Sequence, residues 1–394
     1  MSTLMFRLPH DTSKGDPRDA HAIQFMLHSC PQSSQCISFG ENSNLISAFF
    51  KGFDLRSGLV THLEKFGAAI SLHVNVYEAT FQRDGYFGHA LVKVQKDAEI
   101  DNLLYEHTVG KFLNAYCDLF PCLVRTYGLY RLQNRLLKSS IHNTGLFPTM
   151  FDPVNTIDPF DDYNKDVFQQ VIASHCDGAD KNVLVTHFIK GSVTLREFLN
   201  GDETLIINNF FGILYQLYFC LEKLGSMFSH YDMHENNILV YKLDEPIRFR
   251  FPYVEFTCEY LTKMIDYAHT FFQSPSVGSI DFAETKCPGF ENVQPFRYRN
   301  PKIEYDQAVI MFFRFCGKVK KRGLLIQETG YFLDRTFIAA TKETRIHEEA
   351  IYTLPQLMDA FSNHVDFLTN TKQPRPTVTL IVTGSSPMTY AKIY

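Results

Sequence analysis

The 394-residue sequence predicts an α+β protein with a small β-rich lobe followed by a mainly helical lobe. Runs of β-forming residues over 71–95 flank a turn at Arg83-Asp84-Gly85, as in an antiparallel hairpin. Apolar residues then recur at helical spacing over 98–116. The second half is mostly helical in pattern, apart from short strands at 237–243 and 261–268. Two lobes fit the length, since a domain usually holds about 150 residues.

These patterns divide the chain into three regions. Residues 1–60 contain mixed Asp, Ser, Gly and Pro clusters, and we interpret them as an N-terminal extension. Residues 61–190 form the expected β-rich N-lobe, with a polar, Pro-containing insertion at about 133–181. Residues 191–394 form the expected helical C-lobe.

Composition narrows the classes of partner. The formal net charge of -5, from 38 Lys+Arg and 43 Asp+Glu, provides no overall basic field for nucleic acid or anionic lipid. Nine cysteines without a C-x-x-C pair indicate thiols in a reducing, intracellular compartment. The N-terminus lacks the pattern of a signal peptide, and polar residues interrupt the apolar stretch 205–228, which favours a buried helix. We therefore expect an intracellular protein without a specific nucleic-acid or membrane partner.

The most informative motif is H-x-D-x-x-x-x-N, formed by His230, Asp232 and Asn237 between a long amphipathic helix and a β-strand. Phosphoryl transfer needs a carboxylate to orient the attacking hydroxyl and accept its proton, and an amide oxygen to hold a metal ion on the phosphates. Asp232 and Asn237 match these needs. The spacing resembles the catalytic loop of the protein-kinase-like superfamily.

The resemblance extends to both sides of this loop. Asp266-Tyr267-Ala268 stands where the family carries its metal-binding D-F-G, so Asp266 is expected to bind Mg²⁺. The run ALVKV at 90–94 resembles the V-A-I-K strand, which makes Lys93 the expected contact of the ATP phosphates. On the following helix Glu106 is the expected ion-pair partner of Lys93, with Glu99 as the alternative.

Two nucleotide-binding segments complete the expected site. A glycine-rich loop would fall at 67–73, where Gly67 is the single glycine, so backbone contact with the phosphates is expected to be reduced. The strand that ends near Thr186, His187 and Phe188 resembles the hinge, whose backbone would bond the adenine edge.

Other family features match less fully. Asp306 resembles the large-lobe aspartate that braces the catalytic loop, whereas Cys287-Pro288-Gly289 is the nearest candidate for the A-P-E motif. The resemblance covers about 67–316, and its style is similar to divergent serine/threonine protein kinases of large DNA viruses. For a viral protein this implies the host cytoplasm or the virion.

The resemblance implies an ATP- and Mg²⁺-dependent phosphotransferase, most simply a serine/threonine protein kinase whose partners are ATP and a protein hydroxyl. Three alternatives stay open. One is a pseudokinase that serves as a binding or virion-associated module, and another is a small-molecule phosphotransferase. The third is a zinc site, because His230, Asp232 and His234 also read as H-x-D-x-H.

Overall fold

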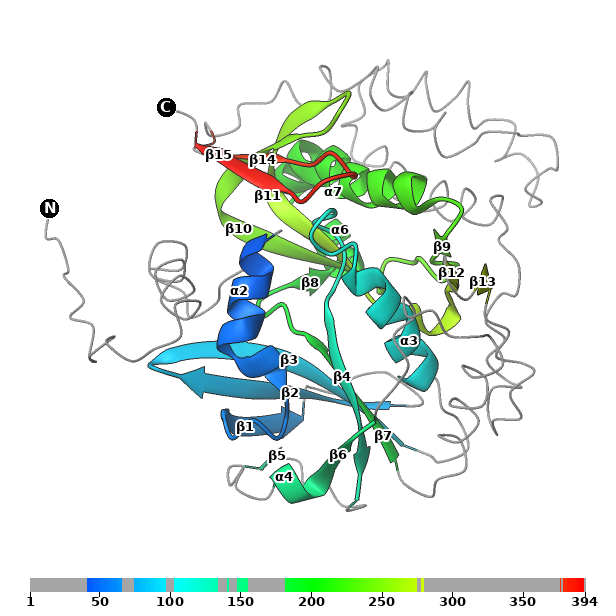
Figure 1. The fold of residues 1–394 in the computed structure, drawn as a ribbon. Coiled ribbons are helices and arrows are strands. Elements are labelled where there is room, and N and C mark those ends of the chain that lie inside the picture. Colours follow the sequence, from blue (N-terminus) through cyan, green and yellow to red (C-terminus); the bar gives the residue numbers. More distant parts are fainter. Residues whose placement is uncertain are drawn as a thin grey trace, which may run out of the picture.

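In the computed structural model the chain mixes α-helices with β-strands and is rich in strands (Figure 1). The structure describes residues 41–65, 74–96, 103–133, 140–141, 147–154, 181–274, 278–279, 376 and 378–392.

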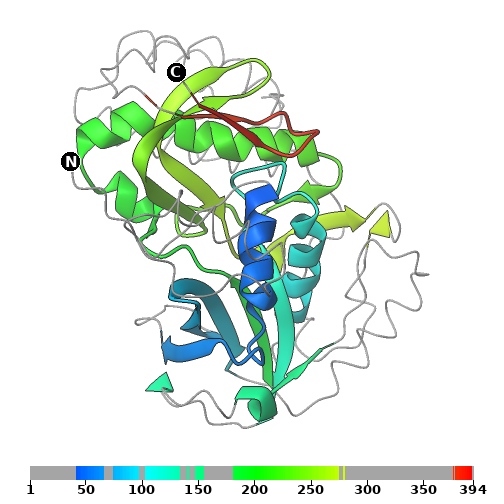
Figure 2. The same cartoon turned by 60° about the vertical axis from the view of Figure 1, so that its left-hand side comes forward.

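The N-terminal half is organised around a curled, seven-stranded antiparallel sheet (Figures 1 and 2). Its strands are β1 (Val60–Lys65), β2 (Val74–Arg83), β3 (Tyr86–Gln95), β4 (Thr126–Leu132), β5 (Ser140–Ile141), β6 (Phe151–Pro153) and β7 (Lys181–His187). The spatial order is β5-β1-β2-β3-β7-β4-β6, so β7 crosses back to lie between β3 and β4. β5, β6 and the short helix α4 (Phe147–Met150) lie in the stretch expected as an insertion.

The hairpin expected over 71–95 is confirmed as β2 and β3. Asp84 and Gly85 connect these strands with φ values of 49° and 84°, as a two-residue hairpin turn with the favoured twist requires. The register pairs Val76 with Lys93. β7 is buried along its length, as its continuous apolar sequence predicts for a central strand.

One face of the sheet is covered by residues that precede it. Helix α2 (Glu41–Phe49) and the turn η2 (Lys51–Phe53) bring Phe49, Phe50 and Phe53 into a buried cluster with the sheet. A Cβ atom on Gly88 would lie 2.8 Å from Phe53, so glycine allows these rings to approach the strand. Within the expected extension 1–60, the described segment therefore contributes side chains to the core: Ile46, Phe49, Phe50, Phe53, Leu55 and Val60.

Helix α3 (Leu103–Asn114) packs close to β4. Gly110 lies at the point of contact, where a Cβ atom would fall 2.0 Å from the Thr126 Oγ1 atom. Asn114 fastens the helix end to the strand, because its side chain bonds both the N–H and the carbonyl of Thr126. The part of the expected helix before residue 103 lies outside the described residues.

The second half brings together two helices and two further sheets. The elements are β8 (Val193–Thr194), α6 (Leu195–Leu199), α7 (Glu203–Leu224), β9 (Phe228–Ser229), β10 (Ile238–Arg250), β11 (Glu255–Met264), η4 (Tyr267–His269), β12 (Phe271–Ser274), β13 (Gly278–Ser279), β14 (Val378–Ile381) and β15 (Thr389–Lys392). Helices alone were expected to dominate residues 191–394. In the described part of that region, α6 and α7 pack with strands instead.

Both helices begin at residues that cap them. Thr194 and Glu197 form a reciprocal capping box at the start of α6, and the Asp202 side chain accepts a bond from the Leu205 N–H at the start of α7. In the described part of the chain, α7 alone has the length and apolar composition to cross a membrane, and 81% of that window is buried inside the structure. This burial matches the core helix expected for the stretch.

β10 and β11 form a hairpin that is longer than the two short strands expected around Asp266 (Figure 2). β14 adds to β10 in parallel and β15 adds to β14, so the C-terminal strands extend the same sheet. The run CLVRTYGLYRL at 122–132 predicts a strand pair from its sequence, but a single strand, β4, forms there. The Cys122 and Leu123 carbonyls instead accept bonds from the Met264 N–H and the Lys263 Nζ.

Adding a methyl group between α3 and β4 should be costly. Gly110→Ala is expected to lower the free energy of unfolding by about 1–3 kcal/mol, because the helix must move away from Thr126. Urea denaturation measures the loss. The double variant with Thr126→Ala should recover part of it, and equal stability of Gly110→Ala and the parent would contradict this packing.

Candidate active site

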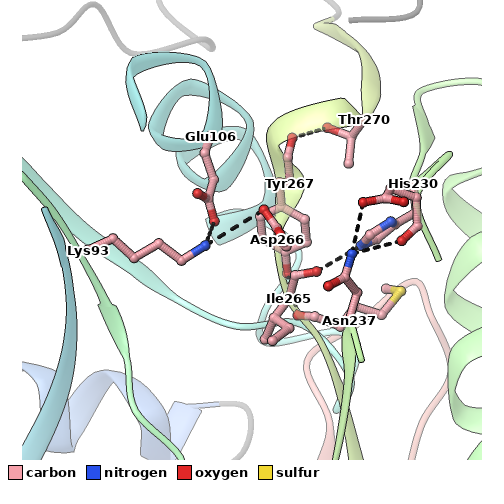
Figure 3. A network of polar contacts seen from close by, with 10 residues as sticks. Lys93, Glu106, His230, Asn237, Ile265, Asp266, Tyr267 and Thr270 are labelled. Atoms are coloured by element: carbon pink, nitrogen blue, oxygen red, sulfur yellow. Dashed lines mark hydrogen bonds and ion pairs between the residues drawn. The ribbon is translucent and has the colours of Figure 1, made fainter. Parts of the chain in front are cut away.

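The site is built around a lysine that projects from β3. Lys93 Nζ lies 2.6 Å from Oε1 of Glu106 on α3 and 3.8 Å from Oδ1 of Asp266 (Figure 3). The side chains of Lys93 and Glu106 are 13% and 6% exposed, whereas that of Asp266 is 42% exposed. Three residues that were predicted from the sequence, on a strand, a helix and a loop, therefore lie together in the structure.

Burial and charge act against one another in this triad. Burial alone would lower the pKa of Lys93, but Glu106 and Asp266 together raise it above its usual value. Burial raises the pKa of Glu106, and the Lys93 ammonium opposes that rise. Burial also works against ionisation of Asp266, yet the Lys93 ammonium brings its pKa below the usual value. A charged lysine and an ionised, accessible Asp266 result.

The residues of the H-x-D-x-x-x-x-N motif are joined to the same centre. Asn237 Nδ2 donates to the Asp232 carbonyl at 2.9 Å and to Asp232 Oδ2 at 3.0 Å. The Ile265 N–H donates to the Asn237 carbonyl at 3.0 Å, and the His230 ring lies 3.1 Å from the Ile265 carbonyl. Burial lowers the pKa of His230, so its neutral ring donates to that carbonyl. The two segments that precede Asn237 and Asp266 are thus bound side by side (Figure 3).

Two residues of the site have unusual backbone angles. Tyr231 has φ of 55° and Asp266 has φ of 69°, in the left-handed region that side chains other than glycine rarely adopt. Such strain persists only where the surrounding structure holds it, and it is concentrated at functional sites. Both angles turn the chain next to an acidic side chain of the candidate site.

Metal binding was expected from Asn237 and Asp266. Because Asn237 uses Nδ2 for both of its bonds to Asp232, its Oδ1 atom lies on the side of Ile265 and Asp266 (Figure 3). One carboxylate and one amide oxygen suit Mg²⁺, which takes few protein ligands and completes its shell with water and substrate phosphates.

The zinc alternative finds less support in the geometry. The His230 ring bonds to Ile265, and His234 Nδ1 accepts the Asn236 N–H at 3.2 Å, which leaves Nε2 3.7 Å from Asp232 Oδ1. The described ranges contain no cluster of three or more His, Cys, Asp or Glu side chains arranged to hold a metal ion.

The expected adenine-binding segment lies at the end of β7. Thr186 pairs with strands on both of its sides, and the His187 N–H donates to the Arg125 carbonyl at 2.8 Å. Burial lowers the pKa of the His187 ring to about 3, so this side chain is neutral. Of the three expected residues, Thr186 and His187 belong to β7 and Phe188 directly follows it.

A second polar cluster was not identified from the sequence. Glu78 Oε1 on β2 lies 2.8 Å from His89 Nδ1 on β3 and 3.2 Å from Lys190 Nζ beyond β7. The His89 hydrogen bond lowers the pKa of Glu78. Alternation along β3 puts His89 on the same face as Lys93, which is the signal that could have revealed it.

Several expected residues lie outside the described part of the chain: Gly67, Glu99, Asp306 and Cys287-Pro288-Gly289. Of the two candidate partners for Lys93, the described one, Glu106, contacts it. Compared with known proteins, the chain matches no family model, and no curated protein matches it in sequence.

Removing Lys93 should destabilise the protein, because the Glu106 carboxylate stays buried. Lys93→Met leaves Glu106 buried and unpaired, so we expect a loss of about 3–5 kcal/mol in the free energy of unfolding near neutral pH. Burial then raises the pKa of Glu106 in the folded state, and a raised pKa gives stability that is present at low pH and lost as pH rises. The deficit should be smaller at pH 5 than at pH 8.

Two controls make this measurement specific. In Lys93→Met/Glu106→Gln the buried acid at position 106 is no longer ionisable, so the pH dependence of the deficit should flatten. Lys190→Met removes a lysine that is 45% exposed and should cost much less. A deficit for Lys93→Met that is independent of pH would contradict the buried pair.

Proposed function

We propose that this protein is an ATP- and Mg²⁺-dependent phosphotransferase of the protein-kinase-like class that acts on serine or threonine hydroxyls of a protein. The observation that carries the proposal is the convergence of five residues, predicted from separate motifs, on one centre: Lys93, Glu106, Asp232, Asn237 and Asp266. Structural ion pairs alone do not require this combination of a fixed cation, an accessible acid and an amide-bound carboxylate.

Each residue has a separate task in the proposed reaction. Lys93, held by Glu106, fixes the ATP phosphates as a cation. Asp266 and Asn237 hold Mg²⁺, which neutralises the charge that develops on the phosphates. Asp232 orients the acceptor hydroxyl and takes its proton, and its bond from Asn237 fixes the direction of the carboxylate.

The order of elements supports the finer fold that accompanies this function, a bilobal kinase-like arrangement. Lys93 lies on the third strand, its partner lies on the helix that follows, and residues 66–73 connect β1 with β2 where the family's glycine-rich loop covers the phosphates. In this proposal 61–190 form the nucleotide-binding lobe and 191–394 the acceptor lobe, in an intracellular protein.

A pseudokinase is the second candidate, because Gly67 is the single glycine of 67–73. The retained charges favour the enzyme, since two acids held near one centre repel each other without a cation between them. A small-molecule acceptor is the remaining alternative for the same chemistry. A phosphotransfer assay with protein and small-molecule acceptors distinguishes the three candidates. A protein kinase modifies the protein acceptor, a small-molecule phosphotransferase modifies the small molecule, and a pseudokinase modifies neither.

Substitution of the two acids should affect different steps. Asp232→Asn is expected to lower kcat about 10²-fold or more with little change in ATP affinity, because the proton acceptor is lost. Asp266→Asn should instead weaken Mg²⁺-dependent nucleotide binding. Steady-state phosphotransfer and nucleotide titration measure the two effects.

The exposed Asp244→Asn is the matched control and should behave like the parent. If Asp232→Asn and Asp266→Asn both transfer phosphate as fast as the parent, the assigned roles are wrong.

A further inference from the structure

We propose that the Tyr105 hydroxyl is a positioning group, which ties the turn after Asp266 to helix α3 and so holds Asp266 ready for the metal ion. This inference rests on the proposed function and adds to it a residue that the sequence motifs did not identify. Its basis is a contact between two segments separated by 165 residues.

The contact is a buried hydrogen bond. Tyr105 precedes Glu106 on α3, and its O–H donates to the Thr270 carbonyl. Tyr105 is 3% exposed and Thr270 is fully buried. Removing the hydroxyl would leave a buried carbonyl without this donor, which costs more than the net value of an ordinary hydrogen bond.

Helix α3 packs against the turn η4 and holds its end. Tyr105 binds the Thr270 carbonyl directly after the turn. Inside the turn, the Thr270 N–H and Oγ1 both donate to the Tyr267 carbonyl, at 3.3 and 2.8 Å. The segment directly after Asp266 is therefore fixed by the bonds inside the turn and by the bond from Tyr105 on α3.

This arrangement explains how the strained Asp266 backbone is maintained. A residue at φ of 69° needs neighbours that determine its position, and the bond from Tyr105 on α3 together with the bonds inside the turn supplies them. The same helix carries the partner of Lys93. A shift of α3 would therefore loosen the Lys93–Glu106 pair and the Asp266 turn together.

Further contacts connect the turn with the segment that precedes His230. The turn leads into β12, whose Phe271 and Phe272 pair with Ser229 and Phe228 of β9, directly before His230. The Tyr105 ring also lies 6.1 Å from the Phe272 ring. Because this ring contact does not involve the hydroxyl, Tyr105→Phe separates the hydrogen bond from the packing.

The test is a magnesium titration of the full-length protein. In Tyr105→Phe, the Mg²⁺ concentration for half-maximal binding of a non-hydrolysable ATP analogue should rise about three- to tenfold, the range that loss of one hydrogen bond produces. Binding measured without Mg²⁺ should not change. The matched control is Tyr116→Phe, because the Tyr116 hydroxyl contacts Met227 Sδ at 3.6 Å rather than the turn, and it should titrate like the parent.

The outcomes distinguish the two proposals. If the parent binds the magnesium nucleotide and Tyr105→Phe requires no more Mg²⁺, the positioning role is wrong while the proposed function stands. An equal loss of binding with and without Mg²⁺ would show a merely structural residue and also overturn the role. If the parent itself shows no Mg²⁺-dependent binding, the proposed function fails and the inference fails with it.

Discussion

The candidate site depends on one interaction, the buried ion pair between Lys93 and Glu106. Each charge would be costly in the interior without the other, so the pair holds β3 and α3 at a fixed separation. Asp266 is placed relative to this pair, with its carboxylate 3.8 Å from the lysine and exposed to the site. The cation proposed to bind phosphate and the acid proposed to bind metal are thereby positioned by a single structural contact.

Packing and the backbone make that contact possible. Gly110 lets α3 approach β4 closely, and the first rung of the β10–β11 hairpin places the segment of Asn237 beside that of Asp266. A strained backbone next to buried charges lowers the stability of the folded protein, and such strain is concentrated at functional sites. Here the strain at Tyr231 and Asp266 occurs where the proposed chemistry needs it.

Local signals predicted the parts of the structure that depend on local chemistry. Asp84-Gly85 predicted the hairpin, the apolar run predicted the central strand β7, and motif spacing predicted the residues that meet at the site. Contacts between distant segments left no such signal. One such contact is the packing of α2 on the sheet, and another is the Tyr105–Thr270 bond. In both cases the sequence pattern of each segment predicts its own helix, strand or turn and gives no information about the partner segment. The strand expected around Cys122 failed for the same reason, since its partners come from residues 263–264.

The most direct test of the central claim is a thermal unfolding experiment on the parent protein with a non-hydrolysable ATP analogue, in the presence and absence of Mg²⁺. The account predicts a rise in Tm that requires Mg²⁺, with a stabilisation of about 2.7 kcal/mol when the ligand is at one hundred times its Kd. An unchanged Tm at millimolar nucleotide with Mg²⁺ would contradict it.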